Sequence, residues 1–176
     1  MARNTEIKAR VADPVALFER AARIADSGPI AIFQDDTFFH CSNGRLKLRD
    51  FGDGRGELIF YQRPDQHGPK ESFYVLSPSA SPASLREALG LAHGISGRVI
   101  KQRSLFLAGQ TRIHLDEVQG LGHFMELEVV LDETQSSADG VRIAEALMRE
   151  LGIDARALID GAYVDLLRET TPKEVA

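Results

Sequence analysis

Alternation between polar and apolar residues predicts strands along most of the chain. Residues 4–11 read NTEIKARV, in which polar or charged side chains take every second position. Successive side chains of a strand point to opposite faces, so this segment predicts a strand with one polar face and one apolar face. Similar segments are bounded by Gly, Pro, Asn and Ser, which favour turns. The predicted strands are residues 4–11, 30–39, 45–50, 57–63, 71–77, 98–108, 111–118 and 123–131.

Helical patterns fill the remaining parts of the chain. Asp13 is suited to cap a helix that begins at Pro14, and apolar residues then recur at helical spacing until Gly28. Three further helical patterns lie at residues 82–92, 138–151 and 155–168. Because most connections between the strands are short, neighbouring strands are expected to be antiparallel. The whole pattern predicts an antiparallel α+β fold.

Composition narrows the possible classes of protein. With 43% hydrophobic and 27% charged residues, the 176-residue chain predicts a single domain over residues 1–176. The sequence shows neither a long apolar run nor the apolar middle of a signal peptide, so we expect a cytoplasmic protein without a membrane partner. The lone Cys41 supports neither an intrachain disulfide nor a structural zinc site. A net charge of -5 without a basic block argues against a nucleic-acid partner.

Charged residues are grouped by sign on single strand faces. Like charges about 7 Å apart on one strand repel by roughly 0.6 kcal/mol in water, so such grouping is mildly unfavourable by itself. The opposite faces of these strands are apolar and require cover, which the predicted helices can supply. The same-sign groups are Arg45, Lys47 and Arg49; Lys101 and Arg103; and Glu126 and Glu128, whereas Arg112, His114 and Asp116 share one face with mixed sign.

Two architectures are compatible with this pattern. Alternation alone favours a sheet with helices on one face and solvent on the other, where the charges are simply hydrated. The separation of bases from acids favours an eight-stranded antiparallel β-barrel with a charged interior and helices packed outside, because a solvated face usually mixes signs. Rows of Lys and Arg suit a polyphosphate, and clustered carboxylates suit a divalent cation that bridges its oxygens.

Several motifs in order give the chain a family resemblance. They are NTEIKAR, GRLKLRD, ELIFYQRPD, VIKQR, RIHLDEVQGLG, FMELEVVL and YVDLL. The sequence resembles the CYTH superfamily of triphosphate tunnel metalloenzymes almost from end to end. That superfamily includes class IV adenylyl cyclases, thiamine triphosphatases and inorganic triphosphatases. The wording of NTEIKAR, GRLKLR and IHLDEVQGLG is most similar to the class IV cyclase-like branch.

The resemblance implies a tunnel of eight antiparallel strands and a set of site residues. It implies Mg²⁺ or Mn²⁺ as cofactor, with Glu6, Asp116, Glu126 and Glu128 as metal ligands. It implies phosphate binding by Lys8, Lys47, Arg49, Arg63, Lys101, Arg103 and Arg112, and catalytic roles for Lys101, Arg103, Arg112 and Asp116. Asn4 stands where the family's ExExK motif has its first glutamate, so the number of bound metals stays open.

Some of these residues could have a structural role in place of metal or phosphate binding. The charged groups could be a hydrated strand face, and Asp116 could pair with Arg112 instead of binding metal. His114 could contact phosphate or move a proton, or it could be a hydrogen-bonded structural residue. Tyr163 is expected to be a packing residue, and Tyr61 to line the tunnel or pack at its rim.

Two enzymatic functions follow from the resemblance, and a third, noncatalytic function stays open beside them. The first is a cyclase that converts ATP to cyclic AMP and pyrophosphate. The second is a triphosphatase that hydrolyses inorganic or thiamine triphosphate, and the third is a noncatalytic module that binds polyphosphate or nucleotide. The expected partner is a small-molecule triphosphate, and a homodimer is expected from the resemblance alone. The sequence leaves the reaction and the substrate open.

Overall fold

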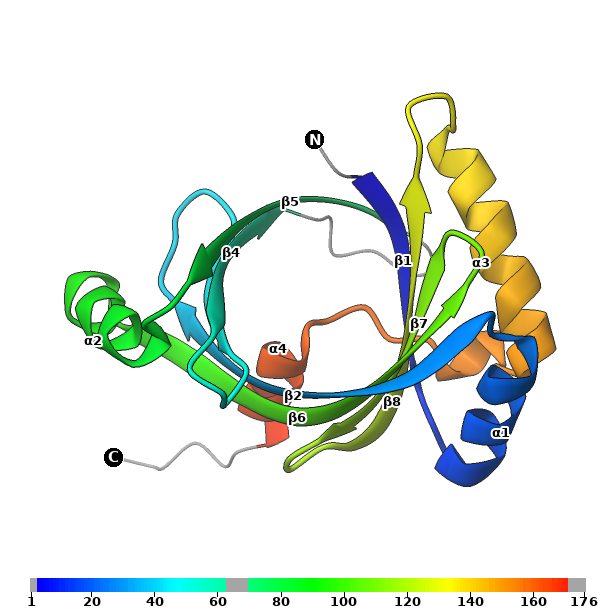
Figure 1. Cartoon of the computed structure of the whole chain (residues 1–176), viewed down its shortest axis with the longest axis horizontal. Coiled ribbons are helices and arrows are strands. Elements are labelled where there is room, and N and C mark those ends of the chain that lie inside the picture. Colours follow the sequence, from blue (N-terminus) through cyan, green and yellow to red (C-terminus); the bar gives the residue numbers. More distant parts are fainter. Residues whose placement is uncertain (1–2, 63–69, 171–176) are drawn as a thin grey trace.

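A closed ring of eight antiparallel strands forms the centre of the protein. The computed structural model describes residues 3–62 and 70–170. The strands are β1 (Arg3–Arg10), β2 (Ser27–Phe39), β3 (Arg45–Asp50), β4 (Gly56–Gln62), β5 (Lys70–Ser79), β6 (Ile95–Ala108), β7 (Thr111–Val118) and β8 (Gly122–Leu131). Their order around the ring is β1-β5-β4-β3-β2-β6-β7-β8, so β1 closes the sheet between β5 and β8 (Figure 1). The eight predicted strands and the barrel are therefore confirmed.

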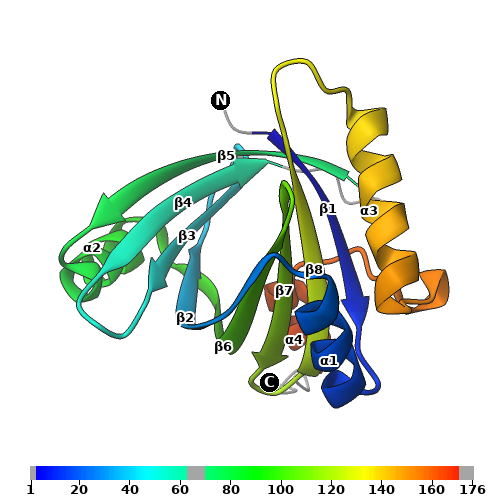
Figure 2. The same cartoon turned by 45° about the vertical axis from the view of Figure 1, so that its right-hand side comes forward.

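Four helices of the described ranges pack against the ring, three on its outer side and the last with its first residue, Tyr163, lining the interior. They are α1 (Pro14–Ile24), α2 (Pro82–His93), α3 (Ser137–Leu151) and α4 (Tyr163–Thr170). Helix α3 packs against β1 and β8 and also contacts α1, whereas α2 packs beside β2 and β3 (Figures 1 and 2). Asp13 caps α1 as predicted, because its carboxylate accepts a hydrogen bond from the backbone amide of Ala16. No helix in the described ranges is long and apolar enough to cross a bilayer.

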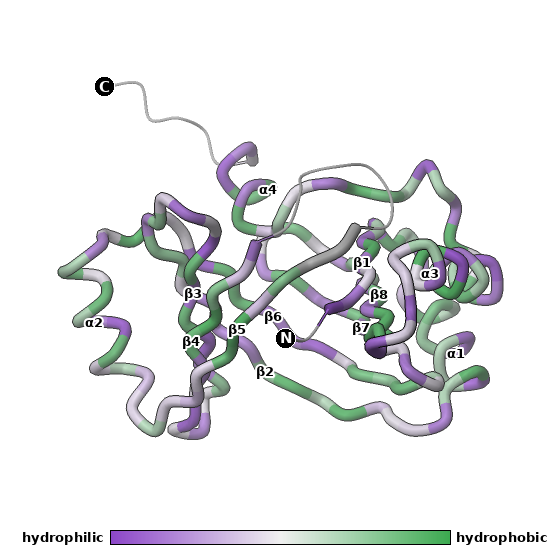
Figure 3. The backbone as a smooth tube through the Cα atoms, turned by 90° about the horizontal axis from the view of Figure 1, so that it is seen from above, coloured by the Kyte–Doolittle hydropathy of each residue, from purple (hydrophilic) through white to green (hydrophobic). Residues whose placement is uncertain are grey.

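The main hydrophobic core lies outside the ring, between the sheet and helices α1 and α3. Ile7, Ile113 and Leu127 project outward from β1, β7 and β8 and are fully buried there. Burying a side chain of this size stabilises the fold by roughly 1.5–3 kcal/mol. Figure 3 shows hydrophilic and hydrophobic positions alternating along the tube. The apolar faces of these strands therefore bind the helices, and the polar faces are left for the interior.

The predicted helix at residues 155–168 is wrong in its first part. A 3₁₀ turn at Ala155–Ala157 is followed by extended chain, and α4 begins only at Tyr163. The extended segment lies along β1, where the Ile159 amide donates to the Lys8 carbonyl and Leu158 forms a bridge with Ala9. Pairing with a strand therefore replaces the helix that apolar spacing favours.

Candidate functional site

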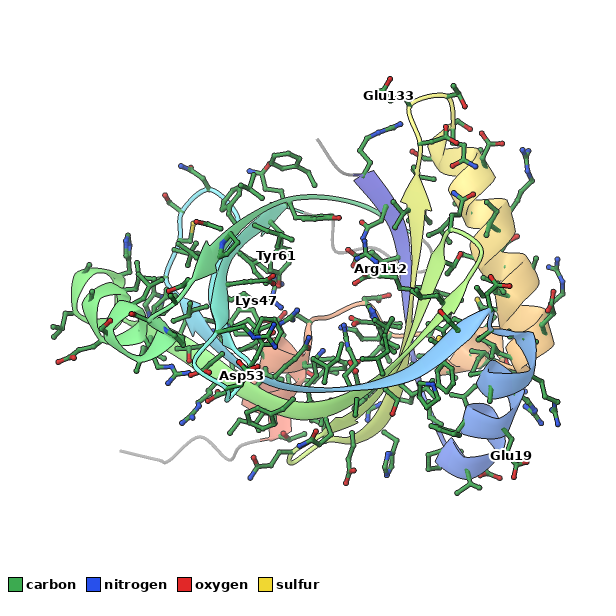
Figure 4. All side chains as sticks on the ribbon, viewed as in Figure 1. Glu19, Lys47, Asp53, Tyr61, Arg112 and Glu133 are labelled. Atoms are coloured by element: carbon green, nitrogen blue, oxygen red, sulfur yellow. The ribbon has the colours of Figure 1, made fainter. Side chains whose placement is uncertain are left out.

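The interior of the ring is a cavity of about 390 Å³ with a charged lining. Side chains from all eight strands and from the start of α4 line it. Lys47 and Tyr61 project inward from one wall, and Arg112 projects inward from the opposite wall (Figure 4). The acidic, basic and histidine lining residues are Glu6, Lys8, Asp36, Lys47, Arg49, Glu57, Lys101, Arg103, Arg112, His114, Glu126 and Glu128.

On the β2–β3 wall, Asp36 holds two bases together. Its carboxylate accepts hydrogen bonds from Lys47 Nζ at 2.6 Å and from Arg49 Nε and Nη2 at 2.8 and 2.9 Å. Burial would raise the pKa of Asp36, but Arg49 and Lys47 hold it well below its ordinary value. Burial and neighbouring Arg49 lower the pKa of Lys47 to about 8, against the attraction of Asp36.

A second buried carboxylate, Asp116, organises the bases of β6. Arg103 donates to both of its oxygens at 2.6 Å, and Lys101 Nζ and the Tyr163 hydroxyl donate at 2.9 and 3.0 Å. The Asp116 side chain is 0% exposed. Burial would raise its pKa, but Arg103 and Lys101 lower it below the ordinary value. Asp116 is thus an internal counter-ion for these two bases.

Glu126 links the bases of β1 and β6. Its two carboxylate oxygens lie 3.0 Å from Lys8 Nζ and 2.5 Å from Arg103 Nη2. Burial would raise the pKa of Glu126, yet Lys8 and Lys101 hold it well below its ordinary value. Arg103 therefore bridges Asp116 and Glu126. Through this bridge the bases of β6 are connected to the glutamates of β8.

The acidic wall is formed by β1 and β8. Glu6 and Glu128 are cross-strand partners, and Glu128 accepts a hydrogen bond from Arg112 Nη1 at 3.0 Å. Burial raises the pKa of Glu128; the Arg103 charge opposes that shift, whereas the charges of Glu126 and Glu6 add to it. Glu128 thus differs from Glu126, because it gains protons more easily than an ordinary glutamate.

His114 completes a group that can hold a cation. Ligand atoms of His114, Glu126 and Glu128 all lie within 4.8 Å of one another. His114 Nδ1 is buried and has no hydrogen-bond partner among the described residues. Burial and the charge of Arg103 lower the pKa of His114 well below 6.5, so the imidazole is neutral at neutral pH. A neutral imidazole beside two carboxylates can hold a divalent cation, and the two carboxylates are the ligands that suit Mn²⁺ or Mg²⁺.

The remaining wall of the cavity is apolar and aromatic. Most of its residues lie on β2, β4, β5 and β6, and one of them, Leu105, is the cross-strand partner of His114. Tyr61 lines the cavity, which answers one of the alternatives left open by the sequence. The apolar and aromatic lining residues are Ile32, Phe38, Phe51, Ile59, Tyr61, Tyr74, Leu76, Val99, Leu105, Ala162 and Tyr163.

The structure gathers most of the predicted site residues but separates one of them from the cavity. Asp116 is not among the described residues that line the cavity, because it lies behind Lys101 and Arg103. Arg63 lies outside the described residues. Asn4 lines the cavity and is buried, and its Oδ1 has no hydrogen-bond partner in the described part of the chain. The other predicted residues, Glu6, Lys8, Lys47, Arg49, Lys101, Arg103, Arg112, Glu126 and Glu128, all line it.

Sequence reasoning missed Asp36 and the contacts of Tyr163. Asp36 alternates with Gln34 and Phe38 on the inward face of β2. The alternation of side chains along this strand could therefore have predicted that Asp36 points into the ring. The pairing of Asp36 with bases depends on the register between β2 and β3, which places it opposite Arg49. Nothing in the sequence pattern specified that register.

The sequence and the structure were compared with known protein families and solved structures. The model of the CYTH domain matches residues 2–163. The chain belongs to the CYTH family. No curated protein matches the sequence significantly.

Several solved structures share the CYTH fold of this chain. A protein of Pyrococcus horikoshii is 21% identical with a TM-score of 0.82, over 93% of this chain and 99% of that one. A candidate adenylate cyclase of Vibrio parahaemolyticus is 18% identical with a TM-score of 0.78, over 96% and 99%. A candidate adenylyl cyclase of Hippeastrum, described as having a dominant triphosphatase activity, is 16% identical with a TM-score of 0.65, over 98% and 100%.

Proposed function

We propose that this protein is a divalent-metal-dependent enzyme that acts on a nucleoside or other organic triphosphate, with the conversion of ATP to cyclic AMP and pyrophosphate as the first candidate reaction. One observation carries the proposal: bases on four strands and a His–Glu–Glu group on β7 and β8 face the same cavity inside the closed ring. The bases are Lys8, Lys47, Arg49, Lys101, Arg103 and Arg112. Such a cavity suits several phosphate oxygens together with a cation.

The bases are held in place before any substrate binds. Asp36 fixes Lys47 and Arg49, and Asp116 fixes Lys101 and Arg103. A group that is already oriented does not need to reorganise when charge develops on a reacting phosphate, which is the main source of electrostatic catalysis. We assign Asp116 to this positioning role and not to metal binding. Its oxygens already accept four hydrogen bonds from Lys101, Arg103 and Tyr163, and it is not among the described residues that line the cavity, so a cation would have to displace one of these donors.

The metal is assigned to the acidic wall. The orphaned Nδ1 of buried His114 and the carboxylates of Glu126 and Glu128 fit a divalent cation, with Glu6 as an additional ligand across the β1–β8 pair. A bound Mg²⁺ or Mn²⁺ supplies charge that polarises phosphate oxygens. The chain's own contribution is to hold these ligands on the neighbouring strands β7, β8 and β1 and to link Glu126 to Asp116 through Arg103.

The apolar wall supports an organic substrate over inorganic triphosphate. Phe51, Tyr61 and Tyr74 face the same cavity as the bases, and aromatic side chains can pack against a nucleobase or another ring. In the cyclase reaction the ribose 3′ hydroxyl attacks the α-phosphorus and pyrophosphate leaves. In the alternative, water attacks the terminal phosphorus and orthophosphate leaves. The described activity of the Hippeastrum neighbour favours keeping triphosphatase as the second candidate.

Product analysis separates these reactions. The purified protein is incubated with Mg²⁺ or Mn²⁺ and, separately, with ATP, tripolyphosphate and thiamine triphosphate. Glu126→Gln and Glu128→Gln test the site, and Glu117→Gln is the matched control, because Glu117 is exposed on the outer face of β7. Cyclic AMP and pyrophosphate, lost in both site variants, establish the cyclase. Orthophosphate establishes the triphosphatase, and binding without turnover leaves a noncatalytic binding module.

A further inference from the structure

Tyr163 is the first residue of α4, and its side chain reaches into the ring. It is buried and lines the cavity, and its ring packs edge-on against Phe124 at 4.9 Å between centroids. Two ammonium groups lie over the same ring, Lys8 Nζ at 3.8 Å and Lys101 Nζ at 4.9 Å from its centroid. Its hydroxyl donates to Asp116. The residue thus contacts two bases and the counter-ion of one of them.

The geometry points to Tyr163 as a positioning residue, whose aromatic ring holds the ammonium groups of Lys8 and Lys101 in place for the phosphates of the substrate. This inference rests on the proposed function, since it concerns the same triphosphate. The negative face of an aromatic ring attracts a cation, and the attraction is strongest where water is excluded. Both lysine side chains are about 95% buried.

A ring suits this role better than another carboxylate would. An ammonium group has three N–H donors, and a carboxylate oxygen uses at least one of them. Lys8 already pairs with Glu126, and Lys101 with Asp116. The ring adds attraction without adding an anion that would repel phosphate. Burial and the charge of Arg103 lower the pKa of Lys101, and the nearby ring opposes that loss of charge.

The test varies the charge of the ring face at nearly constant shape. Tyr163→Phe removes the hydroxyl and keeps the ring, and Asp116 retains its bonds to Lys101 and Arg103. The variants that follow carry 4-fluoro-, 3,5-difluoro- and 3,4,5-trifluorophenylalanine at position 163, because fluorine progressively withdraws negative charge from the ring face. The dissociation constant of tripolyphosphate is measured by calorimetry, and the melting temperature is recorded for each variant.

We expect the affinity for tripolyphosphate to fall stepwise along the fluorinated series, by about tenfold in total, with little change in melting temperature. Tyr163→Leu should weaken binding at least as much. Val164→Ala is the matched control: Val164 is the next residue of α4, is buried, and is not among the described cavity-lining residues, so it should lower stability without changing affinity. An affinity that stays constant across the series, in a protein that binds tripolyphosphate, overturns the role of the ring. A wild-type protein that binds neither tripolyphosphate nor ATP instead overturns the proposed function.

Discussion

Glu6 and Glu128 lie directly opposite each other on β1 and β8, and both line the cavity. Directly opposed like charges destabilise a pair of strands, by an amount on the order of 0.2–1 kcal/mol. Arg112 compensates part of this repulsion through its bond to Glu128. The remaining electrostatic repulsion between Glu6 and Glu128 therefore destabilises the folded protein, and a bound cation would remove it.

Glu128→Gln should stabilise the metal-free protein and weaken its binding of metal. The pKa of Glu128 is raised in the folded state, so ionised Glu128 costs stability at neutral pH, and removing its charge should gain roughly 0.5 kcal/mol. The loss of a ligand should weaken Mn²⁺ binding by on the order of tenfold or more, since even supporting residues of metal sites have effects of that size. Urea unfolding and Mn²⁺ titration measure the two effects. A variant that is both less stable and unchanged in Mn²⁺ affinity would exclude the assignment, and Glu117→Gln should change neither quantity.

Asp116→Asn should cause a large loss of stability. It leaves Lys101 and Arg103 buried beside a neutral amide, and breaking a buried ion pair typically costs about 3–5 kcal/mol. Asp36→Asn should cost less, because Lys47 and Arg49 are 14% exposed whereas Lys101 and Arg103 are 4–5% exposed. Equilibrium denaturation of both variants gives the comparison. The reverse order of stability would contradict this view of the two counter-ions.

Acid should destabilise the protein through the same two carboxylates. The pKa values of Asp36 and Asp116 are lowered from 3.8, so both groups bind fewer protons in the folded state than in the unfolded state. Their contribution to stability is present above pH 4 and is lost as pH falls toward the folded pKa values. Denaturation measured from pH 6 downward should show the decline below about pH 4. Asp36→Asn should have a flatter profile; an unchanged slope would place the acid sensitivity elsewhere.

Triphosphate affinity should decrease as pH rises above about 8. Burial and Arg49 lower the pKa of Lys47 to about 8, so the ammonium form is lost from the free protein above that pH. A bound phosphate favours the charged lysine, and binding therefore requires proton uptake in this range. Tripolyphosphate binding measured from pH 7 to 10 should show the decrease. Lys47→Arg should extend the plateau, because arginine stays charged; the same decrease in that variant would point to another group.

Gly97→Ala should disturb the seating of α4. A Cβ atom at Gly97 would clash with Val164 Cγ2, so either β6 or α4 must shift. Overpacking of this kind costs about 1–3 kcal/mol, and the displaced helix should also weaken triphosphate binding through Tyr163. Gly90→Ala in α2 is the control, since its Cβ would meet Ile95 at an ordinary 3.5 Å. Thermal unfolding and tripolyphosphate titration compare the two variants, and equal behaviour would show that α4 tolerates the shift.

The sequence predicted the strands well because alternation and turn residues are local signals. The β2 strand begins at Ser27, earlier than the predicted residue 30, since pairing with β6 extends it past Gly28 and Pro29. The predicted helix over residues 155–168 failed for a non-local reason, because the Lys8 carbonyl and the amide of Ile159 pair across almost the whole chain. Apolar spacing cannot distinguish a helix from a segment that packs beside a strand.

For the site, the sequence indicated most of the residues that face the cavity, with Asp116 as an exception, but not how they pair. Alternation correctly placed Lys101 and Arg103 on one inner face. Whether a carboxylate there binds a cation or neutralises a base depends on its distance from those bases. Asp116 lies opposite Arg103 in the β6–β7 register and is fully engaged by it, a fact that only the register supplies.

The closure of the ring has a consequence for how the chain acquires its structure. β1 pairs with β8 and β5, so the first strand of the ring to be synthesised finds one partner only after the last strand of the ring has been synthesised. Tyr163 follows later still. When distant parts of a chain pair, the chain loses much conformational entropy before the new contacts stabilise it. Folding is therefore slow. A nascent chain that ends before residue 122 would expose an unpaired β1 edge, the kind of surface on which chaperones act and from which aggregation begins.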